Sequence, residues 1–190
     1  MDVVGIYFSP RAGGNSDLLM DEFLKGALSV GAGIKAIYAR DLDISGCLEC
    51  GGCDKTGECV IDDDMSDVYP LLIETKRVAV ASPVFFYGPP AQGKALIDRC
   101  QALWSRTRLD KNLKRPDGYG FLLGVGATKG QNLFEVINLC AKYFLEAIGL
   151  PLKLDSLTYR KIEGQGAIKD HPTALSEAFE AGKLFAGSGS

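Results

Sequence analysis

The sequence predicts an α/β protein built on a parallel, doubly wound β-sheet. Short apolar runs rich in β-branched residues alternate along the chain with longer segments in which apolar side chains recur at helical spacing. The run at 77–81 is continuously apolar after its first residue, which is typical of a strand buried on both faces. With 190 residues, of which 46% are hydrophobic and 24% charged, the chain suits one globular domain.

Five strands and five helices are predicted in strict alternation. The strands cover residues 3–8, 34–39, 77–81, 119–125 and 152–159, and the helices cover residues 17–30, 65–75, 91–106, 132–148 and 172–184. Leu19, Phe23 and Ala27 show the helical spacing of the first helix. The second helix has no well-defined start, because Pro70 disfavours a helix interior. The turn at 149–151, Gly-Leu-Pro, ends the fourth helix.

Five alternating strands fit the order 2-1-3-4-5 of the flavodoxin-like three-layer sandwich better than a six-stranded Rossmann sheet. Residues 1–186 are predicted to form this single domain, with a cysteine-rich insert at 41–64 and a flexible tail at 187–190. A connection as long as this insert is usually functional. Ligands of such sheets bind at the carboxyl ends of the strands, so the loops after the first, third and fourth strands should carry the chemistry.

Composition and charge exclude several classes of protein. The net charge of −3 argues against a nucleic-acid partner. The sequence has no apolar run of 18 residues and does not start like a signal peptide, so we expect a cytoplasmic protein without a membrane segment. The single histidine, His171, is expected at a helix start and excludes sites that need two histidines.

The loop after the first strand, residues 9–16, has the composition of an anion site. Ser9, Arg11, Asn15 and Ser16 supply hydroxyl, guanidinium and amide groups, and the first helix begins directly behind them. A phosphate is the expected anion, although the Walker A pattern of nucleotide hydrolases is absent. The alternative is an ordinary turn with a capping residue.

The loop after the third strand, residues 82–92, is rich in aromatic residues and proline. Pro83, Val84, Phe85 and Phe86 would make a rigid apolar platform for a flat ring system. The alternative is that these aromatics close over a helix or form a subunit contact.

The loop after the fourth strand, residues 124–130, is rich in glycine. Gly126, Ala127 and Thr128 could bring backbone N–H groups to one edge of the same ring. The loop also resembles a degraded dinucleotide fingerprint, and an ordinary turn is a further alternative.

Four cysteines stand in the pattern C-x2-C-x2-C-x5-C inside the insert: Cys47, Cys50, Cys53 and Cys59. Three cysteines at successive x2 spacings are typical of ferredoxin runs that wrap a cubane cluster, and the fourth could complete the ligand set. Structural zinc usually uses two distant C-x2-C pairs, but zinc, free thiols and a disulfide stay open as alternatives. Cys100 and Cys140 occupy apolar positions of helices and are expected to pack in the interior.

Two charged segments are interpreted as surface features. Positive charge is concentrated between residues 106 and 115, which predicts a solvated loop or a dock for the 2′-phosphate of NADPH or an acidic electron carrier. The acidic run Asp62-Asp63-Asp64 is expected to favour the start of the second helix, with cation binding as the alternative.

Together the segments SPRAGGNS (9–16), SPVFFYGPPAQGKALIDR (82–99) and the glycine loop resemble the NADPH-dependent FMN reductase family. The cysteine spacing and the residues that follow it look like the iron–sulfur flavoprotein branch of that superfamily. The resemblance implies that Ser9, Arg11, Asn15 and Ser16 hold the FMN phosphate. It places residues 83–86 against the isoalloxazine, residues 126–128 at its pyrimidine side, and a [4Fe–4S] cluster on the four cysteines.

These observations predict an FMN-dependent oxidoreductase or electron-transfer flavoprotein, with NAD(P)H as a candidate co-substrate and no catalytic side chain beyond the flavin. The resemblance further implies a homodimer or homotetramer, and a ferredoxin-type carrier is a candidate partner. A cluster loop that meets the flavin of a neighbouring subunit would explain the long insert. The alternatives are a cluster-free NAD(P)H-dependent FMN or quinone reductase, a non-enzymatic redox or zinc module, and a nucleotide-binding Rossmann protein.

Overall fold

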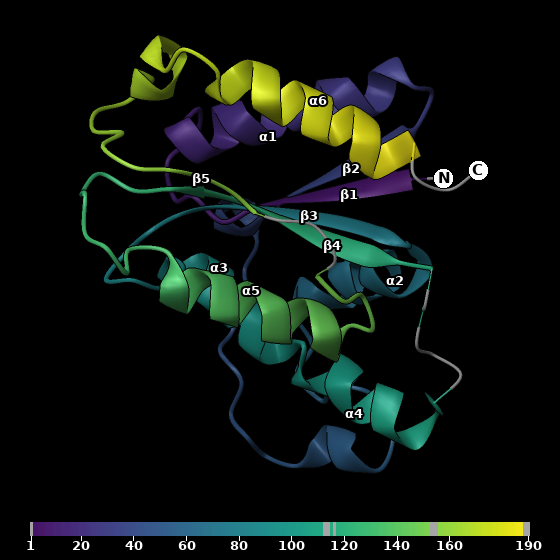
Figure 1. Ribbon diagram of the computed structural model, residues 1–190. Helices are drawn as coiled ribbons and strands as arrows, with labels where there is room; N and C mark the ends of the chain where they lie inside the picture. The colour runs from purple at the N-terminus through teal and green to yellow at the C-terminus, as the bar shows by residue number, and fades with distance from the viewer. Residues whose placement is uncertain (1, 112–114, 116, 153–155, 188–190) are drawn as a thin grey trace.

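The computed structural model describes residues 2–111, 115, 117–152 and 156–187. Its centre is a parallel sheet of five strands in the order β2-β1-β3-β4-β5, which confirms the predicted strand order (Figure 1). The strands are β1 (Asp2–Tyr7), β2 (Gly33–Tyr38), β3 (Arg77–Pro83), β4 (Tyr119–Val125) and β5 (Leu157–Tyr159). The helices are α1 (Asn15–Ser29), α2 (Met65–Glu74), α3 (Ala91–Arg99), α4 (Gln101–Leu109), α5 (Glu135–Ala147) and α6 (Ala174–Gly187).

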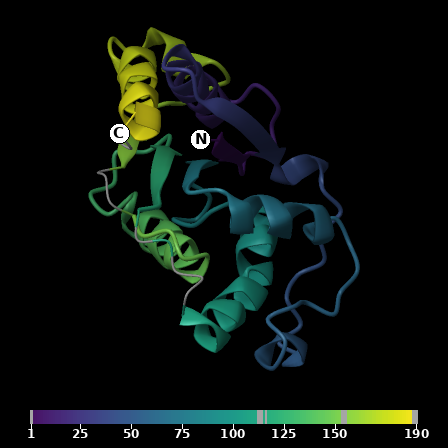
Figure 2. The same cartoon turned by 90° about the vertical axis from the view of Figure 1, so that its right-hand side faces the viewer.

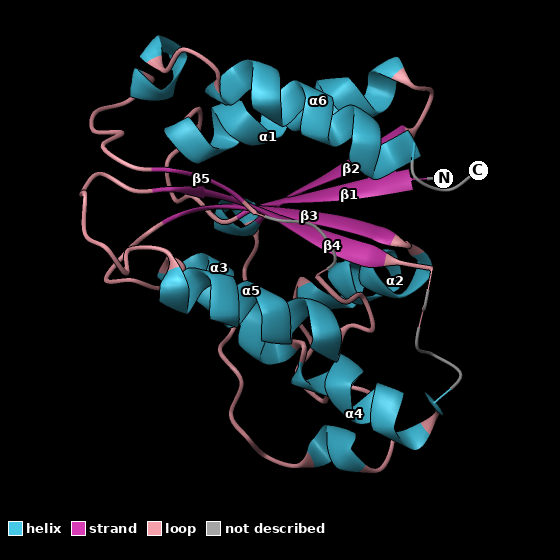
Figure 3. Ribbon diagram, viewed as in Figure 1, coloured by secondary structure: helices cyan, strands magenta, loops and turns pink. Residues whose placement is uncertain are grey.

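The helices form a layer on each face of the sheet, as Figure 3 shows. Helices α1 and α6 cover one face, and α2, α3 and α5 cover the other. The side chains of β1 alternate between the two cores: Val3 and Tyr7 face α1, whereas Val4 and Ile6 face the opposite layer. Both faces of the central strands are therefore buried, which is why these strands are continuously apolar.

The predicted helix at 91–106 is wrong as a single element, because it breaks at Cys100 into α3 and α4. The Cys100 N–H donates to the Ile97 carbonyl at 3.0 Å, a tight turn that ends α3. At the same point the Tyr69 hydroxyl donates to the Arg99 carbonyl at 2.9 Å. A side chain that enters the helical ladder is a common cause of a break.

The break directs α4 away from the sheet toward the cysteine insert. Figures 1 and 2 show both leaving the sandwich on the same side, beside one another. Gly57 of the insert, with φ +71°, packs on α4 so closely that a Cβ would lie 2.7 Å from Cβ of Arg106. The insert is thus packed against a helix rather than free in solvent.

The C-terminal elements differ in their limits from the prediction. The last strand was predicted over 152–159; β5 covers Leu157–Tyr159, Leu152 forms a single bridge to Gly120, and 153–155 lie outside the described residues. The His171 Nδ1 accepts the Ala174 N–H at 3.1 Å, which confirms its place at a helix start. Gly187 ends α6, so the rest of the predicted tail, 188–190, lies outside the described residues. Over the described ranges, no helix has both the length and the apolar character needed to cross a bilayer.

Candidate functional site

A pocket of about 250 Å³ lies where four βα loops meet at the carboxyl edge of the sheet. Eight of the predicted flavin-site residues line it: Ser9, Arg11, Asn15, Ser16, Pro83, Val84, Phe85 and Ala127. Phe86, Gly126 and Thr128 are not among its lining residues. The pocket thus joins loops that are far apart in the sequence, at the place where doubly wound sheets bind ligands.

The first loop ends at the N-terminus of α1, where backbone N–H groups point outward without partners in the helix. Ser16, in the first turn, is 2% exposed, and its hydroxyl makes no hydrogen bond with any described residue. The Ser9 hydroxyl instead bonds within the loop, 3.0 Å from the Arg11 carbonyl. A buried hydroxyl without a hydrogen-bond partner is destabilising, and an anion bound here would accept from both this hydroxyl and the free N–H groups of the helix. The arrangement is therefore typical of an anion site.

A buried ion pair between Asp17 and Arg40 binds the backbone of the loop at residues 9–16. Asp17 accepts hydrogen bonds from the Gly13 N–H at 3.1 Å and from Arg40 at 2.9 Å. Arg40 also reaches the Ser9 carbonyl at 3.3 Å. Burial raises the pKa of Asp17, while Arg40 and the Gly13 N–H oppose that shift. Arg40 therefore offsets a carboxylate that would otherwise repel an anion at the start of α1.

Asn15 has a role that the sequence did not reveal. Its amide nitrogen donates to the Gly164 carbonyl at 2.7 Å, and its Oδ1 accepts the Ile168 N–H at 3.2 Å. These bonds fasten the segment after β5, and Ile162, Glu163 and Gly164 line the pocket. Sequence reasoning missed this fourth wall. The only signal was its position after a parallel strand, which places it at the same edge of the sheet.

The aromatic loop forms a tight hairpin. Phe85 and Gly88 exchange two backbone hydrogen bonds of 2.9 Å, and the two residues between them, Phe86 and Tyr87, have φ of +48° and +68°. Non-glycine residues in this conformation cost of order 1–3 kcal/mol each and cluster at functional sites. Phe85 lines the pocket, but Phe86 is fully exposed, so the predicted platform of consecutive aromatics reduces to Phe85 with Pro83 and Val84.

The glycine loop is fastened to the exit of β5. The Gly126 N–H donates to the Tyr159 carbonyl at 2.9 Å, and the Gly126 carbonyl accepts the Ile162 N–H at 3.2 Å. A Cβ on Gly126 would lie 2.6 Å from Cδ2 of Leu133, so a larger residue there would require the Leu133 side chain to shift. Of the three residues predicted at the ring edge, only Ala127 faces the pocket.

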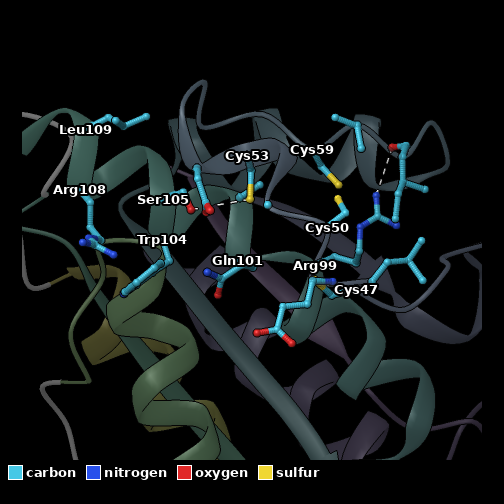
Figure 4. A pocket seen from close by; sticks show the side chains of 17 residues that line it. Cys47, Cys50, Cys53, Cys59, Arg99, Gln101, Trp104, Ser105, Arg108 and Leu109 are labelled. Carbon is cyan, nitrogen blue, oxygen red and sulfur yellow. Dashed lines mark hydrogen bonds between the residues drawn. The ribbon is translucent and has the colours of Figure 1, made fainter.

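A second cavity, of about 670 Å³, lies between the insert and α4, and all four insert cysteines line it (Figure 4). The Cys50 and Cys59 side chains point toward one another, whereas the Cys53 sulfur lies 3.7 Å from the Ser105 hydroxyl. Within the described ranges, no three Cys, His, Asp or Glu side chains are close enough to hold one metal ion. The structure therefore places the predicted thiols around one cavity without assembling them into a metal site.

Arg99 lies in the wall of this thiol cavity and was not predicted as a site residue. Burial alone would raise the pKa of Cys59, but the Ile61 N–H and the Arg99 guanidinium outweigh it and lower that pKa. A thiol with a lowered pKa is more readily present as thiolate, the form that binds metals. The available signal was a charged residue on the apolar side of a helix, three positions after Leu96.

Of the remaining sequence predictions, some agree with the structure and others do not. Cys100 is buried, as predicted, and Cys140 is half-buried. Asp63 accepts the Met65 N–H at 3.1 Å at the start of α2, in agreement with the predicted role of the acidic run. The basic segment is not one exposed group, because Arg115 bonds carbonyls at the ends of α2 and α5, while Lys114 lies outside the described residues.

Comparison with known proteins supports this picture. The sequence model of the family described as NADPH-dependent FMN reductase matches residues 1–132. The chain is 33% identical over 131 residues to an iron–sulfur flavoprotein of Methanocaldococcus jannaschii, which covers 69% of this chain and 66% of that protein. It is 33% identical over 129 residues to an iron–sulfur flavoprotein of Methanosarcina thermophila, which covers 68% and 65%. The matches thus span slightly less than two thirds of these relatives.

Solved structures show the same fold. An NAD(P)H:quinone oxidoreductase from Methanothermobacter marburgensis superposes with a TM-score of 0.75 over 97% of this chain and 95% of that one, at 14% identity. A flavodoxin from the domain Archaea superposes with a TM-score of 0.59 over 98% and 97%, at 16% identity. At such identities the likeness is one of architecture, and it agrees with the observed strand order.

Proposed function

Because the chain belongs to the NADPH-dependent FMN reductase family, we propose that it is an FMN-dependent oxidoreductase that also carries one [4Fe–4S] cluster. The observation that carries the flavin assignment is the edge pocket, in which an unpartnered buried hydroxyl at a helix N-terminus lies close to an apolar wall. The proposed cluster is supported by the four thiols around one cavity. It is also supported by two relatives that are named iron–sulfur flavoproteins, although this chain matches slightly less than two thirds of their length.

The residues present fit the phosphate end of FMN. Ser16 would donate its free hydroxyl, the first turn of α1 would donate backbone N–H groups, and Arg11 would add charge at the mouth. Ser9 would shape the loop and Asn15 would hold the wall formed by residues 162–164. The phosphate contacts proposed for Ser9 and Asn15 are thus secondary to their roles in positioning the loops.

The ring end would rest on the loops after β3 and β4. Pro83, Val84 and Phe85 present an apolar surface, and Ala127 with its neighbours Gly126 and Thr128 would flank the opposite edge. Phe86, which is fully exposed beside this wall, would reach the ring only from the rim. An apolar wall of this kind excludes water from one face of a bound ring and fixes its orientation.

The four thiols fit a cluster by their number and type. Cys47, Cys50, Cys53 and Cys59 line a single cavity large enough for an inorganic core, and a buried guanidinium faces them. The flavin pocket and this thiol cavity share no lining residue, so cofactors in the two sites would be separated within one chain. A homo-oligomer in which the insert of one subunit approaches the pocket of another would bring them together.

Bound FMN can accept electrons as a hydride and release them singly, and an iron–sulfur cluster exchanges one electron at a time. The chain would hold the two groups and exclude water around them, without an acid or base of its own. NAD(P)H is the proposed donor class, and an acidic one-electron carrier is the proposed partner class.

Flavin and metal analysis of protein purified without oxygen tests this proposal. The expected result is one FMN and about four irons per chain. Replacing Cys53 with alanine should abolish the iron and leave FMN bound, because the two sites share no residue. Replacing the buried Cys100 serves as the matched control and should leave the iron in place. Loss of FMN together with iron in C53A would refute the separation of the sites.

A cluster-free NAD(P)H-dependent FMN or quinone reductase is the second candidate. The observation that favours it is the orientation of Cys53, whose sulfur lies against Ser105 rather than with the other thiols. This candidate predicts one FMN per chain, no iron after anaerobic reconstitution, and full NAD(P)H oxidation by C53A.

A further inference from the structure

Arg99 is a cation buried in the wall of the thiol cavity. It is the last residue of α3, and its side chain is 0% exposed. Burying a guanidinium is costly unless its charge and its N–H groups are compensated. The groups of the described chain that accept hydrogen bonds from its guanidinium all belong to the cysteine insert, so this side chain joins the insert to α3.

The contacts of Arg99 lie on both sides of the cysteine segment. Its guanidinium donates to the Ser45 carbonyl at 3.0 Å, two residues before the first cysteine. It also donates to the Ile61 carbonyl at 3.2 Å, two residues after the last cysteine, and forms an ion pair with Asp63. Asp63 in turn accepts the Ser45 N–H at 3.0 Å. Arg99 therefore bridges the two ends of the loop that carries all four thiols, and it reinforces the direct bond between Ser45 and Asp63.

The same guanidinium faces the thiols. Figure 4 shows it beside the Cys50 and Cys59 side chains, and its Nε is buried without any hydrogen bond to a described residue. The Asp63 carboxylate and the Ser45 carbonyl both accept from Nη1, and the Ile61 carbonyl accepts from Nη2, so these partners leave the Nε N–H free. An N–H donor and a positive charge are thus available to a sulfur ligand at Cys59.

We propose that Arg99 positions the iron–sulfur cluster, by closing the cysteine loop and by placing a buried positive charge next to the Cys59 ligand. This inference rests on the cluster of the proposed function. Reduction of a cluster adds negative charge, and hydrogen bonds and charge near the sulfurs tune its potential. Arg99 therefore raises the reduction potential of the cluster, in addition to holding its ligands in place.

Three variants separate the two effects. R99Q removes the charge and most of the contacts, whereas R99K keeps the charge but cannot span the separate acceptors. R108Q is the matched control, because Arg108 lines the same thiol cavity but is exposed and stacks over Trp104 at 4.5 Å from the ring centroid. FMN content reports whether each variant keeps its overall fold, since the flavin pocket lies elsewhere.

The readouts are iron per chain, the cluster's midpoint potential from a titration followed by electron paramagnetic resonance, and tryptic cleavage at the exposed Lys55 of the cluster-free chain. We expect both R99Q and R99K to lose iron and to be cleaved several-fold faster than the wild type. The clusters that form in R99Q should be at least tenfold harder to reduce, about 59 mV lower in potential, whereas R99K and R108Q stay near the wild type.

The outcomes distinguish this inference from the proposed function. An R99Q protein with wild-type iron, potential and cleavage rate would overturn the inference alone. A shift of the cluster's midpoint potential in R108Q as large as that in R99Q would also overturn it, because the loss of any positive charge at the cavity would then have the same effect. A wild-type chain that binds FMN but never binds iron would overturn the cluster itself, and the charge effect with it.

Discussion

Removal of the Ser16 hydroxyl should weaken FMN binding without lowering the stability of the flavin-free protein. The hydroxyl is buried and makes no hydrogen bond in the described structure, so S16A removes a cost rather than a contact from the flavin-free protein. Leaving a buried polar group unsatisfied costs about 1–3 kcal/mol. The flavin-free S16A protein should therefore be at least as stable as the wild type in urea denaturation.

Bound FMN reverses the sign of this effect. A hydrogen bond from Ser16 to a phosphate is charge-assisted and is worth about 1.5–3 kcal/mol. Since about 1.4 kcal/mol corresponds to a factor of ten in affinity, S16A should weaken FMN binding by roughly 10- to 150-fold. Riboflavin lacks the phosphate, so its affinity should not change.

The assay is a fluorescence titration of flavin-free protein with FMN and, separately, with riboflavin. S29A is the matched control, because Ser29 lies at the other end of α1 and its hydroxyl donates to the Gly26 carbonyl at 2.6 Å. S29A should leave both flavin affinities unchanged. Equal weakening of FMN and riboflavin in S16A, or unchanged FMN binding, would refute the placement of the phosphate.

Two further predictions concern stability. G93A should lower the free energy of unfolding by about 1–3 kcal/mol in urea melts, because the new Cβ would lie 2.5 Å from the Phe8 ring and overpack the contact between α3 and the residue that follows β1. An unchanged midpoint would contradict this packing. Burial raises the pKa of Asp63, but hydrogen bonds from Arg99 and the backbone outweigh it, so the native pKa is lowered. The stabilisation that the Asp63 carboxylate contributes is therefore complete at pH values above its ordinary pKa of 3.8, and it is lost as the pH falls through its lower pKa in the folded protein. The fluorescence of Trp104, the only tryptophan, should report this loss, because Trp104 lines the thiol cavity. A D63N protein should lack this transition, and an identical acid transition in D63N would contradict the assignment.

The sequence predicted the strand order and most elements because these depend on local periodicity. Continuous apolar runs identify buried parallel strands, and strict alternation with helices leaves few topologies. The same reasoning located three of the pocket's four walls, since the loops after β1, β3 and β4 carry residue types suited to anions and rings. The cysteine spacing likewise identified four thiols that line one cavity.

The features that the sequence did not predict depend on contacts between distant segments. The break at Cys100 follows from a hydroxyl of α2 that meets the Arg99 carbonyl, and no residue of the helix itself marks it. The wall at 162–164 is ordinary loop sequence that Asn15 binds across the edge of the sheet. Arg99 differs from a surface arginine only through its place on an apolar helix face, where its partners come from the insert.

Titration of the purified chain with FMN shows whether the pocket at the edge of the sheet is a flavin site. We expect a yellow protein that binds one FMN per chain and binds riboflavin more weakly, because the N-terminus of α1 would hold the phosphate. A colourless chain that leaves the fluorescence of added FMN unchanged, or one that binds riboflavin as tightly as FMN, would contradict it.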